Sequence, residues 1–511
     1  MTKKESTDAT NYDKNVIEVD TKLAKKMGEL KDITNEFADD EIHVFKNIHG
    51  DHAMAVSGHY DLLLVPLTGA HEKLNAYDTS KNFVLSGAKF AKQFSLSTGI
   101  ESKLVAMSNI MDWGEKGDDE SLSIPAKQGL IDGCKETGTW INAGESAVLS
   151  DRVTVDYNIS GTATILIPKK SLPEGKYDLD FEGKKQKYII AKHNDKLVYQ
   201  RCDGNGTKPE LNMERLLRPR ECVIDTAAMT EDDIGKMPLF KLLANLFTVE
   251  VGQVNHPNIE VEHLANQYRE GMMIVENENK NFVPYIMNWT NATGRISGFP
   301  PITINANSTA VALVEHEVFL DPPVSQNNDN ILLINNIINQ NVRCNGLSGI
   351  RPGLIEYFNG DVNYHETKEG RELTMITGNG ATKYHELAQE LYQAGASHFG
   401  HFSGGAWDAK AGKIWAKEGL GAKLNVYAKP HLAHQLIKKE NNLTAKDCAN
   451  KFNYCGEAWV SVSDDKTSEV LDIINKYDYD VHVGGILKNM NKPKLEIYFS
   501  AIKEKVVFQY D

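Results

Sequence analysis

Two distant stretches of this chain end in similar ways, and this likeness constrains the fold more than any other feature. Residues 160–168 read SGTATILIP, and residues 307–315 read NSTAVALVE. Each β-rich ending follows a region in which strand-like and helix-like runs occur together, a pattern that predicts a mixed α/β unit. The sequence therefore suggests a diverged tandem duplication of one such unit.

The first predicted domain covers residues 1–170. Apolar residues at helical spacing predict a short amphipathic helix near its start, and a later helix is expected to end at Gly138. The two predicted helical runs are residues 19–30 and 123–138, and the strand-like runs are residues 53–67, 139–151 and 155–168.

Two further domains follow. The charged, turn-forming stretch from Lys169 to Gln186 is typical of a linker or an exposed hairpin, and the second domain is predicted for residues 187–320. It should contain strands in residues 187–211 and 303–320 and helices in residues 230–247 and 263–275. Two prolines and a polar cluster then predict a boundary, after which residues 325–511 form the third domain. Its clearest piece, residues 457–488, reads as a strand, an Asp-capped helix and a strand.

The composition narrows the classes of partner. The 511 residues carry a net charge of -14, which disfavours sequence-independent binding to nucleic acid or to anionic lipid. No apolar run reaches the roughly 18 residues that cross a bilayer, and no apolar signal segment opens the chain. We therefore expect a cytoplasmic protein without a membrane or nucleic-acid partner. The six cysteines lack a C-x-x-C pair, so reduced thiols are expected rather than a zinc site or disulfides.

The loop from Asp203 to Lys208 is the sharpest local feature. It reads D-G-N-G-T-K, in which Gly204 and Gly206 allow backbone N–H groups to approach an anion, and Lys208 can offset phosphate charge. This pattern favours a phosphate-binding loop, although short glycine turns of this kind are also common without a ligand. The loop lacks the spacing of a Walker motif.

Carboxylates suited to Mg²⁺ follow this loop. Asp225 comes just after an apolar run that reads as strand, and Asp232 lies seven residues further along. Alternatively, Thr230 or Asp232 caps a helix whose first turn is acidic. Upstream, Gly144, Glu145 and Ser146 lie where a strand is expected to turn, so Glu145 is either a further ligand or a solvated loop residue.

A second glycine-rich loop lies in the third domain. Gly400, His401 and Phe402 precede Ser403, Gly404 and Gly405, so that an imidazole, a hydroxyl and exposed amides occur together. Such a set suits a phosphate or an amide substrate, and it is also an ordinary glycine-rich turn. His401 is either an acid-base residue or a hydrogen-bonding residue.

Taken together, these strings resemble the superfamily of aminoimidazole ribonucleotide (AIR) synthetase, the PurM-like ATP-binding enzymes. NYDKNVIEVD is similar to the family's Y-K-x-x-G-V-x-I-D opening, and GCKETGTWINAGESAVLSD resembles its G-C-x-x-x-G-x-x-x-x-G-G-E-T-A segment. D-G-N-G-T-K matches D-G-V-G-T-K apart from Asn205, and ECVIDTAAMTEDD resembles the helix that follows it. In the third domain, CNGLSGIR, HFSGGAW and KFNYCGEAW resemble the family's S-N-G-x-[ST], H-x-[ST]-G-G-G and F-N-x-G-x-G-M segments.

One departure from the family pattern concerns order. In the family, the glycine-rich ATP loop precedes the glutamate segment within one amino-terminal domain, whereas here Glu145 precedes Asp203. Two fused copies of that domain would explain the reversal, the first keeping the glutamate and the second keeping the loop. A large insertion or a permutation is the alternative.

The resemblance implies a fold, a reaction and a set of roles. The fold is α+β (mixed α/β), with amino-terminal domains that share a β-barrel-like sheet flanked by helices and a carboxy-terminal α/β sandwich. As the family's cofactors, ATP would bind residues 203–208 and Asp225, and Mg²⁺ would bind carboxylates; Asp203, Lys208 and His401 would be catalytic. Substrate would contact the glutamate segment and the carboxy-terminal loops. The implied residues are, for Mg²⁺, Asp203, Asp225, Glu145 and Asp232, and, for substrate, Gly144, Glu145, Ser146, Asn345, Ser403, Gly404 and Gly405.

The reaction implied first is that of a cyclo-ligase of purine biosynthesis. ATP would phosphorylate an amide oxygen of a ribose-phosphate substrate, formylglycinamidine ribonucleotide (FGAM), and ring closure would give AIR, ADP and phosphate. The chain would work as a homodimer or as an internal pseudo-dimer. Another small-molecule kinase or amide-activating ligase of this fold is the second interpretation, and a catalytically silent nucleotide-binding relative is the third.

Overall fold

The computed structural model describes most of the chain in two compact units. The amino-terminal unit comprises Lys14–Ile234 and Leu239–Asp321, and the carboxy-terminal unit comprises mainly Pro322–Asp511 together with Gly235–Pro238. The described residues are 23, 25–68, 75–114, 119–148, 157–204, 219–254, 260–278, 283–292, 302–335, 354, 356–361, 367–374, 384–402, 406–440, 442–452, 454–477 and 479–510.

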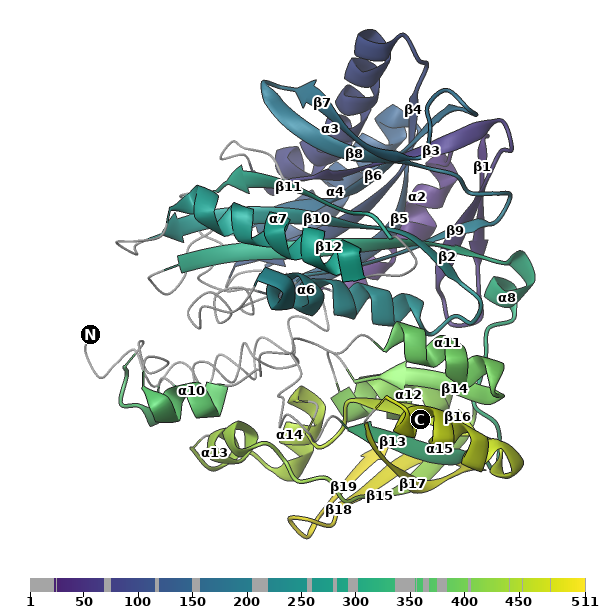
Figure 1. The fold of residues 1–511 in the computed structure, drawn as a ribbon, viewed down its shortest axis with the longest axis vertical. Helices are drawn as coiled ribbons and strands as arrows, with labels where there is room; N and C mark the ends of the chain where they lie inside the picture. Colours follow the sequence, from purple (N-terminus) through teal and green to yellow (C-terminus); the bar gives the residue numbers. More distant parts are fainter. Residues whose placement is uncertain are drawn as a thin grey trace. The chain divides into compact units, whose positions relative to one another are not determined.

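Two six-stranded sheets form the centre of the amino-terminal unit (Figure 1). The first sheet contains β3 (Tyr60–Leu67), β4 (Lys103–Trp113), β5 (Trp140–Val148), β6 (Tyr157–Pro168), β7 (Gly175–Phe181) and β8 (Lys184–Ala191). The second contains β1 (Ile42–Lys46), β2 (His52–Val56), β9 (Leu197–Gly204), β10 (Lys241–Val254), β11 (Tyr285–Asn291) and β12 (Ile302–Val314). Their orders are β5-β4-β6-β3-β8-β7 and β1-β2-β9-β12-β10-β11.

Two pairs of helices flank these sheets. They are α3 (Ala76–Thr98) and α4 (Glu120–Thr137), which accompany the first sheet, and α6 (Pro219–Ile234) and α7 (Val261–Glu278), which accompany the second. Local chemistry sets the ends of α3 and α4: the Asn75 and Asp119 side chains cap their first turns, and Gly99 and Gly138 end them in the left-handed conformation.

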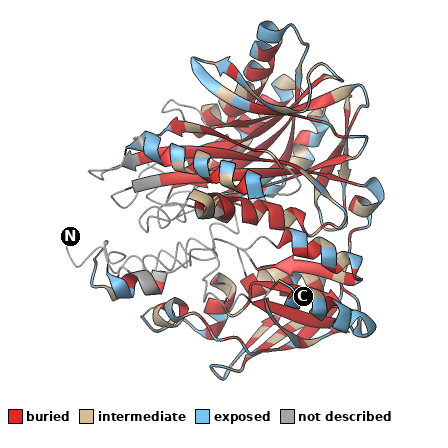
Figure 2. Cartoon of the chain, in the orientation of Figure 1, coloured by how far each residue is buried: buried red, intermediate tan, exposed pale blue. Residues whose placement is uncertain are grey.

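Three apolar clusters stack these elements into four layers, helix, sheet, sheet and helix. One cluster lies between α3, α4 and the first sheet, a second lies between α6, α7 and the second sheet, and a third joins the facing sides of the two sheets. Figure 2 shows that most residues of the central strands β3, β4, β6, β10 and β12 are buried, whereas α3, α4 and α7 expose their outer faces and the hairpin strands β1 and β7 are partly exposed. The predicted mixed α/β class is confirmed.

The two sheets repeat one plan. A hairpin, a strand, a helix, a strand, a helix and two strands follow one another as β1-β2-β3-α3-β4-α4-β5-β6, and again as β7-β8-β9-α6-β10-α7-β11-β12. Both sheets use their strands in the same relative order, with β4–β5 and β10–β11 as the parallel pairs. The hairpins are exchanged, because β2 pairs with β9 and β8 pairs with β3. Each half thereby contributes a hairpin to the other half's sheet.

The carboxy-terminal unit is a seven-stranded sheet with helices. Its order is β14-β16-β13-β17-β15-β18-β19. The strands are β13 (Asn330–Asn335), β14 (Ala396–His401), β15 (Leu420–Val426), β16 (Ala458–Val462), β17 (Asp480–Asn489), β18 (Lys494–Phe499) and β19 (Glu504–Gln509). The helices are α10 (Lys368–Thr374), α11 (His385–Gln393), α12 (Lys413–Lys417), α13 (Leu432–Glu440), α14 (Ala445–Lys451) and α15 (Thr467–Asn475), of which α11 and α15 cover the β13, β14 and β16 side of the core.

Several predicted elements hold, and others are wrong. Residues 53–67 form two strands around a turn, and the predicted strand-helix-strand piece is β16, α15 and β17. The predicted aspartate cap of α15 is wrong, because Lys466 occupies the N-cap position and makes no side-chain capping hydrogen bond. Residues 241–247 belong to β10 instead of a helix, because their apolar side chains fill the space between α6 and the opposite sheet. The division into three domains stays a prediction.

Candidate functional site

The predicted phosphate loop begins at the end of β9. Asp203 and Gly204, the first two residues of the predicted loop, are the last two residues of β9, and they pair with Ser308 and Asn307 of β12. A side chain at Gly204 would come within 2.9 Å of the Asn307 Oδ1 atom, so glycine fits this close approach. The remaining predicted loop residues, Asn205, Gly206, Thr207 and Lys208, lie outside the described residues.

The glutamate segment lies inside β5, in the other sheet, so the prediction that Glu145 lies at a turn or in a loop is wrong. Glu145 is exposed and pairs with Ile110 of β4, while Ala143, two residues earlier, packs with Ile110 and with Cys202 of β9. The Cys202 thiol donates to the carbonyl oxygen of Asn109 at 3.4 Å. The carboxyl-terminal parts of β5 and β9 therefore meet, although they belong to different halves of the unit.

The charges of Glu145 and Asp203 both affect the pKa of the Cys202 thiol. Burial raises the pKa of the Cys202 thiol, and the negative charges of Glu145 and then Asp203 raise this pKa further. Two carboxylates that were 58 positions apart in sequence, from residue 145 to residue 203, thus share one electrostatic environment.

Two cations border these carboxylates. Arg201 forms an ion pair with Asp51 in the turn between β1 and β2, and its guanidinium lies 5.1 Å from the centre of the Tyr199 ring. Lys31 lies on the short helix α2 (Leu30–Thr34). Burial lowers the pKa of its ammonium, and Arg201 lowers it further, whereas Cys202, Asp51 and Glu145 act in the opposite direction.

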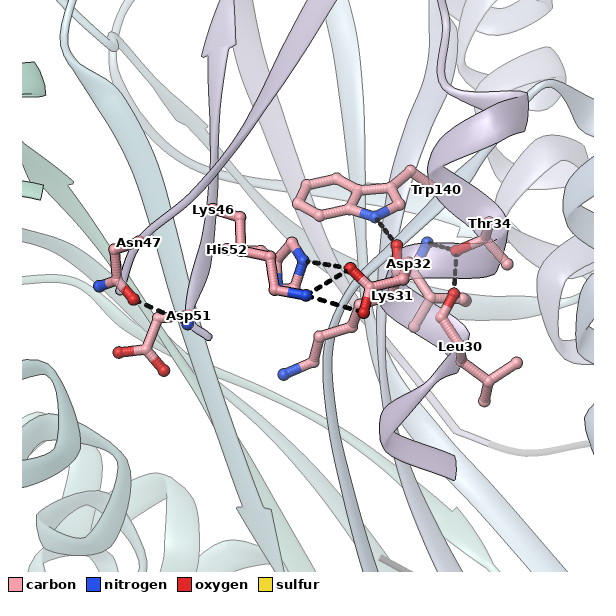
Figure 3. A network of polar contacts seen from close by, with 10 residues as sticks. Leu30, Lys31, Asp32, Thr34, Lys46, Asn47, Asp51, His52 and Trp140 are labelled. Atoms are coloured by element: carbon pink, nitrogen blue, oxygen red, sulfur yellow. Dashed lines mark hydrogen bonds and ion pairs between the residues drawn. The ribbon is translucent and has the colours of Figure 1, made fainter. Parts of the chain in front are cut away.

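Hydrogen bonds hold α2 against β2 and β5 (Figure 3). The Trp140 Nε1 atom donates to the Lys31 carbonyl oxygen at 2.9 Å, and the Ile141 amide donates to Thr34 Oγ1 at 3.0 Å. On the β2 side, Asp32 lies 3.1 Å from His52 Nε2 and accepts from Lys46 at 2.8 Å. Lys31 extends away from this network, and no dashed line in Figure 3 reaches its ammonium. These contacts hold its backbone, and Arg201, Asp51 and Glu145 are among the charges that act on its ammonium.

A buried polar cluster lies between the two sheets. The Asn305 Nδ2 atom donates to Asp112 Oδ2 at 2.7 Å and to Glu250 Oε2 at 3.0 Å, and Asn158 Nδ2 donates to Glu250 Oε2 at 2.7 Å. All four side chains are buried. Charge-assisted hydrogen bonds of this kind offset the cost of removing carboxylates from water.

The predicted acidic cluster sits on α6, not after a strand. Residues 219–234 form one helix, so Asp225 and Asp232 lie inside it and neither Thr230 nor Asp232 caps it, which corrects the expectation of a strand before Asp225. Thr230 Oγ1 instead lies 3.0 Å from Ser308 Oγ of β12. Asp232 is buried, and Asp233, its neighbour, acts electrostatically on Arg201 and Tyr199. The carboxyl-terminal part of α6 therefore faces the Arg201 side of β9.

The other predicted residues are dispersed. Gly144 is exposed beside Glu145, whereas Ser146 is buried and accepts a hydrogen bond from Trp113 Nε1 at 2.7 Å. His401 is buried at the end of β14 in the carboxy-terminal unit, where it pairs with Ala458. Asn345, Ser403, Gly404 and Gly405 lie outside the described residues, and their roles stay predictions.

Sequence reasoning missed Lys31, Asp51 and Arg201. Their separation along the chain gives no local pattern, and each belongs to an ordinary polar or strand segment. The alternation along β9 offered a partial signal, because Arg201 and Asp203 share one face of the strand whose opposite face carries Cys202. In the described ranges, no three His, Cys, Asp or Glu side chains converge as metal ligands. The helices among those residues include none long and apolar enough to span a membrane.

The scan of protein families finds no matching model, and the search of curated proteins finds no significant match. Similar solved structures include thiamine-monophosphate kinase from Stenotrophomonas maltophilia K279a, with a TM-score of 0.40 and 13% identity over 62% of this chain and 90% of that one. Hydrogenase maturation protein HypE has a TM-score of 0.41 and 9% identity over 61% and 88% of the two chains. T. maritima PurL complexed with FGAR has a TM-score of 0.37 and 13% identity over 61% and 45%.

Proposed function

We propose that this chain is an ATP-dependent enzyme that phosphorylates an amide oxygen of a small ribose-phosphate substrate, with cyclo-ligase activity on FGAM as the specific reaction. The observation that carries the proposal is the meeting of β5 and β9. It brings Glu145 and Asp203 into one environment, which is what a shared site for the glutamate segment and the D-G-N-G-T-K loop requires. The motif resemblance described above supports the choice of ATP.

We call the place where β5 and β9 meet the β5–β9 corner, with Glu145, Asp203, Arg201 and Lys31 as its charged residues. These residues suit the binding of a polyphosphate. Backbone N–H groups of the glycine loop would face the phosphates, and Lys208 would offset their charge. Lys31 and Arg201 add two cations at the same corner; Arg201 forms an ion pair with Asp51, and the charge of Glu145 acts to raise the pKa of Lys31. Phosphoryl transfer depends mainly on such positioning and charge stabilisation.

The described carboxylates partly fit Mg²⁺. Glu145 and Asp203 supply the hard oxygen donors that this ion prefers, and Asp225 and Asp232 are the further proposed ligands from α6. Bound there, Mg²⁺ would neutralise charge on the ATP phosphates.

The proposed reaction has two steps. The substrate amide oxygen attacks the γ-phosphorus of ATP, the bond to the β-phosphate bridging oxygen breaks, and ADP leaves. An amine nitrogen of the substrate would then attack the activated amide carbon, the bond from that carbon to the phosphorylated oxygen would break so that inorganic phosphate leaves, and the nitrogen would lose a proton to solvent. The side chains at the β5–β9 corner would hold the triphosphate in line for the first step.

A ligand-dependent melting experiment tests ATP binding. Mg-ATP at 100 times its dissociation constant should stabilise the protein by about 2.7 kcal/mol. Glu145→Gln should reduce this shift, and Glu262→Gln, an exposed glutamate on α7, should leave it unchanged. Absence of any shift in the wild-type protein would reject the proposal and favour a catalytically silent relative.

A product assay tests the reaction itself. Incubation with FGAM and ATP should yield AIR, ADP and phosphate in equal amounts. ATP hydrolysis or phosphoryl transfer that depends on Lys208 but yields no AIR would reject the cyclo-ligase and favour a kinase or another amide-activating ligase.

A further inference from the structure

The two halves of the amino-terminal unit can be aligned residue by residue from their strand pairing. Asp112 pairs with Asn158 between β4 and β6, and Glu250 pairs with Asn305 between β10 and β12. In this register the sequences KLVA of residues 103–106 and KLLA of residues 241–244 coincide.

Irregularities in the sheets support the same register. The ladder between β4 and β6 shifts between Leu104 and Ala106, and the ladder between β10 and β12 shifts between Leu242 and Ala244. A bulge at the same point of two strands, beside matching residues, indicates that both halves derive from one ancestral unit.

This register identifies the counterpart of each residue at the β5–β9 corner. Ile110 pairs with Glu145, and its counterpart Thr248 pairs with Asn288, so Asn288 stands where the other half has Glu145. Gly161 pairs with Leu67 and its counterpart Ser308 pairs with Asp203, so Leu67 stands in place of Asp203. Two residue pairs further from the strand end, Val65 stands in place of Arg201.

The second corner, where β11 approaches β3 and β8, is therefore apolar and neutral where the first is charged. Val65 and Leu67 are buried in the core between the first sheet and its helices. The carboxylate and guanidinium groups of the first corner have no counterparts at these three positions.

Asn288 closes this second corner with hydrogen bonds to the main chain. Its Nδ2 atom donates to the carbonyl oxygens of Pro66 and Lys187 at 2.9 and 3.0 Å, and its Oδ1 atom accepts from the Lys187 amide at 2.8 Å. The Gln186 Nε2 atom also donates to the Pro66 carbonyl oxygen, at 2.9 Å. Asn288 is buried, so its amide ties β11 to β3 and β8 much as a bridge between strands would.

We infer that the amino-terminal unit has two related corners and that only the β5–β9 corner binds a nucleotide. Each chain then binds one nucleotide. The β11–β3 corner is a structural seam, which means that it joins the two sheets and binds no ligand. The inference rests on the proposed function. Its physical basis is that a polyphosphate at the second corner would lie against buried leucine and valine, with no cation in place of Arg201 and with the Asn288 amide already occupied. Desolvating phosphate charge without partners is strongly unfavourable.

Binding stoichiometry tests the inference. Isothermal titration of the full chain with a non-hydrolysable ATP analogue and Mg²⁺ should give one site per chain. Glu145→Gln should weaken this binding about tenfold, and Asn288→Ala should keep one site per chain with an affinity within twofold of the wild-type value.

The outcomes separate the inference from the function on which it rests. Two sites per chain would overturn the inference while supporting nucleotide binding, and so would a single site that is lost in Asn288→Ala and kept in Glu145→Gln. No binding at all would overturn the proposed function itself. Should Asn288→Ala fail to fold, equilibrium dialysis of the wild-type chain with labelled analogue gives the same count.

Discussion

The two halves of the amino-terminal unit share one plan and differ at their corners. At the β5–β9 corner, Glu145 is exposed next to a charged cluster, whereas at the β11–β3 corner the counterpart Asn288 is buried and bonded to the main chain. The difference shows that equivalent positions of the two halves carry different chemistry. One corner carries charged groups, of which Glu145 is exposed, and the other uses the same position to join the two sheets.

The interior cluster is where the two halves depend on each other most. Asn305 donates to a carboxylate of its own half, Glu250, and to one of the opposite half, Asp112. We expect Asn305→Leu to lower the free energy of unfolding by about 3 kcal/mol, because each buried carboxylate loses a hydrogen bond.

Urea denaturation of the variant measures this effect. Asn266→Leu on α7 replaces an exposed asparagine of the same unit and should change the free energy of unfolding by less than about 0.5 kcal/mol. Equal stability of the two variants would show that the interior cluster does not join the halves.

Asn288 provides the second test of the comparison. Asn288→Ala removes three hydrogen bonds to main-chain atoms of β3 and β8, so we expect a loss of about 2 kcal/mol in the free energy of unfolding with nucleotide binding unchanged. Thermal and urea unfolding measure the loss, with Asn266→Ala as the exposed control. A variant as stable as the wild type would argue against a structural seam at this corner.

Glu145 should behave in the opposite way. Because its carboxylate is exposed, Glu145→Gln should leave the free energy of unfolding unchanged and weaken Mg-ATP binding about tenfold, which corresponds to about 1.4 kcal/mol. Titration calorimetry and unfolding of the same preparation measure both quantities. Reduced stability with unchanged binding would reverse the roles assigned to the two corners.

Lys31 should have a small effect on stability that depends on pH. Burial and Arg201 lower its pKa in the folded state, so the unfolded chain binds the proton more tightly. Wild-type stability should therefore rise with pH as this group loses its proton, from the lowered pKa up to the ordinary lysine value. Lys31→Met should remove that dependence, make the protein slightly more stable at pH 7 and weaken Mg-ATP binding a few-fold.

Unfolding at pH 7 and pH 9.5 checks the sign of the Lys31 effect. The difference in unfolding free energy between Lys31→Met and wild type should shrink at the higher pH, and Lys25→Met, an exposed lysine, should show no such trend. A difference that grows with pH would show that Asp51 and Glu145 dominate the environment of Lys31.

Much of the secondary structure follows from local patterns. The helix that ends at Gly138 and the strands of residues 53–67 are where periodicity and glycine predict them, because capping and alternation act over a few residues. The helix prediction for residues 241–247 failed because local patterns alone do not tell a buried helix from a buried strand. An apolar run between two cores reads alike as buried helix or buried strand, and packing on both faces made it β10.

The candidate site, too, has features that local sequence predicts and features that only the tertiary structure decides. From the residues alone came the glycine loop, the exposed glutamate and the hint of duplication in two similar strand endings. Only the tertiary structure decided that β5 of one half reaches β9 of the other, that Lys31 and Arg201 border the carboxylates there, and that Asn288 closes the opposite corner. The reason is that local propensity acts between neighbours in sequence, whereas these contacts depend on which sheet edges meet after the two halves exchange their hairpins.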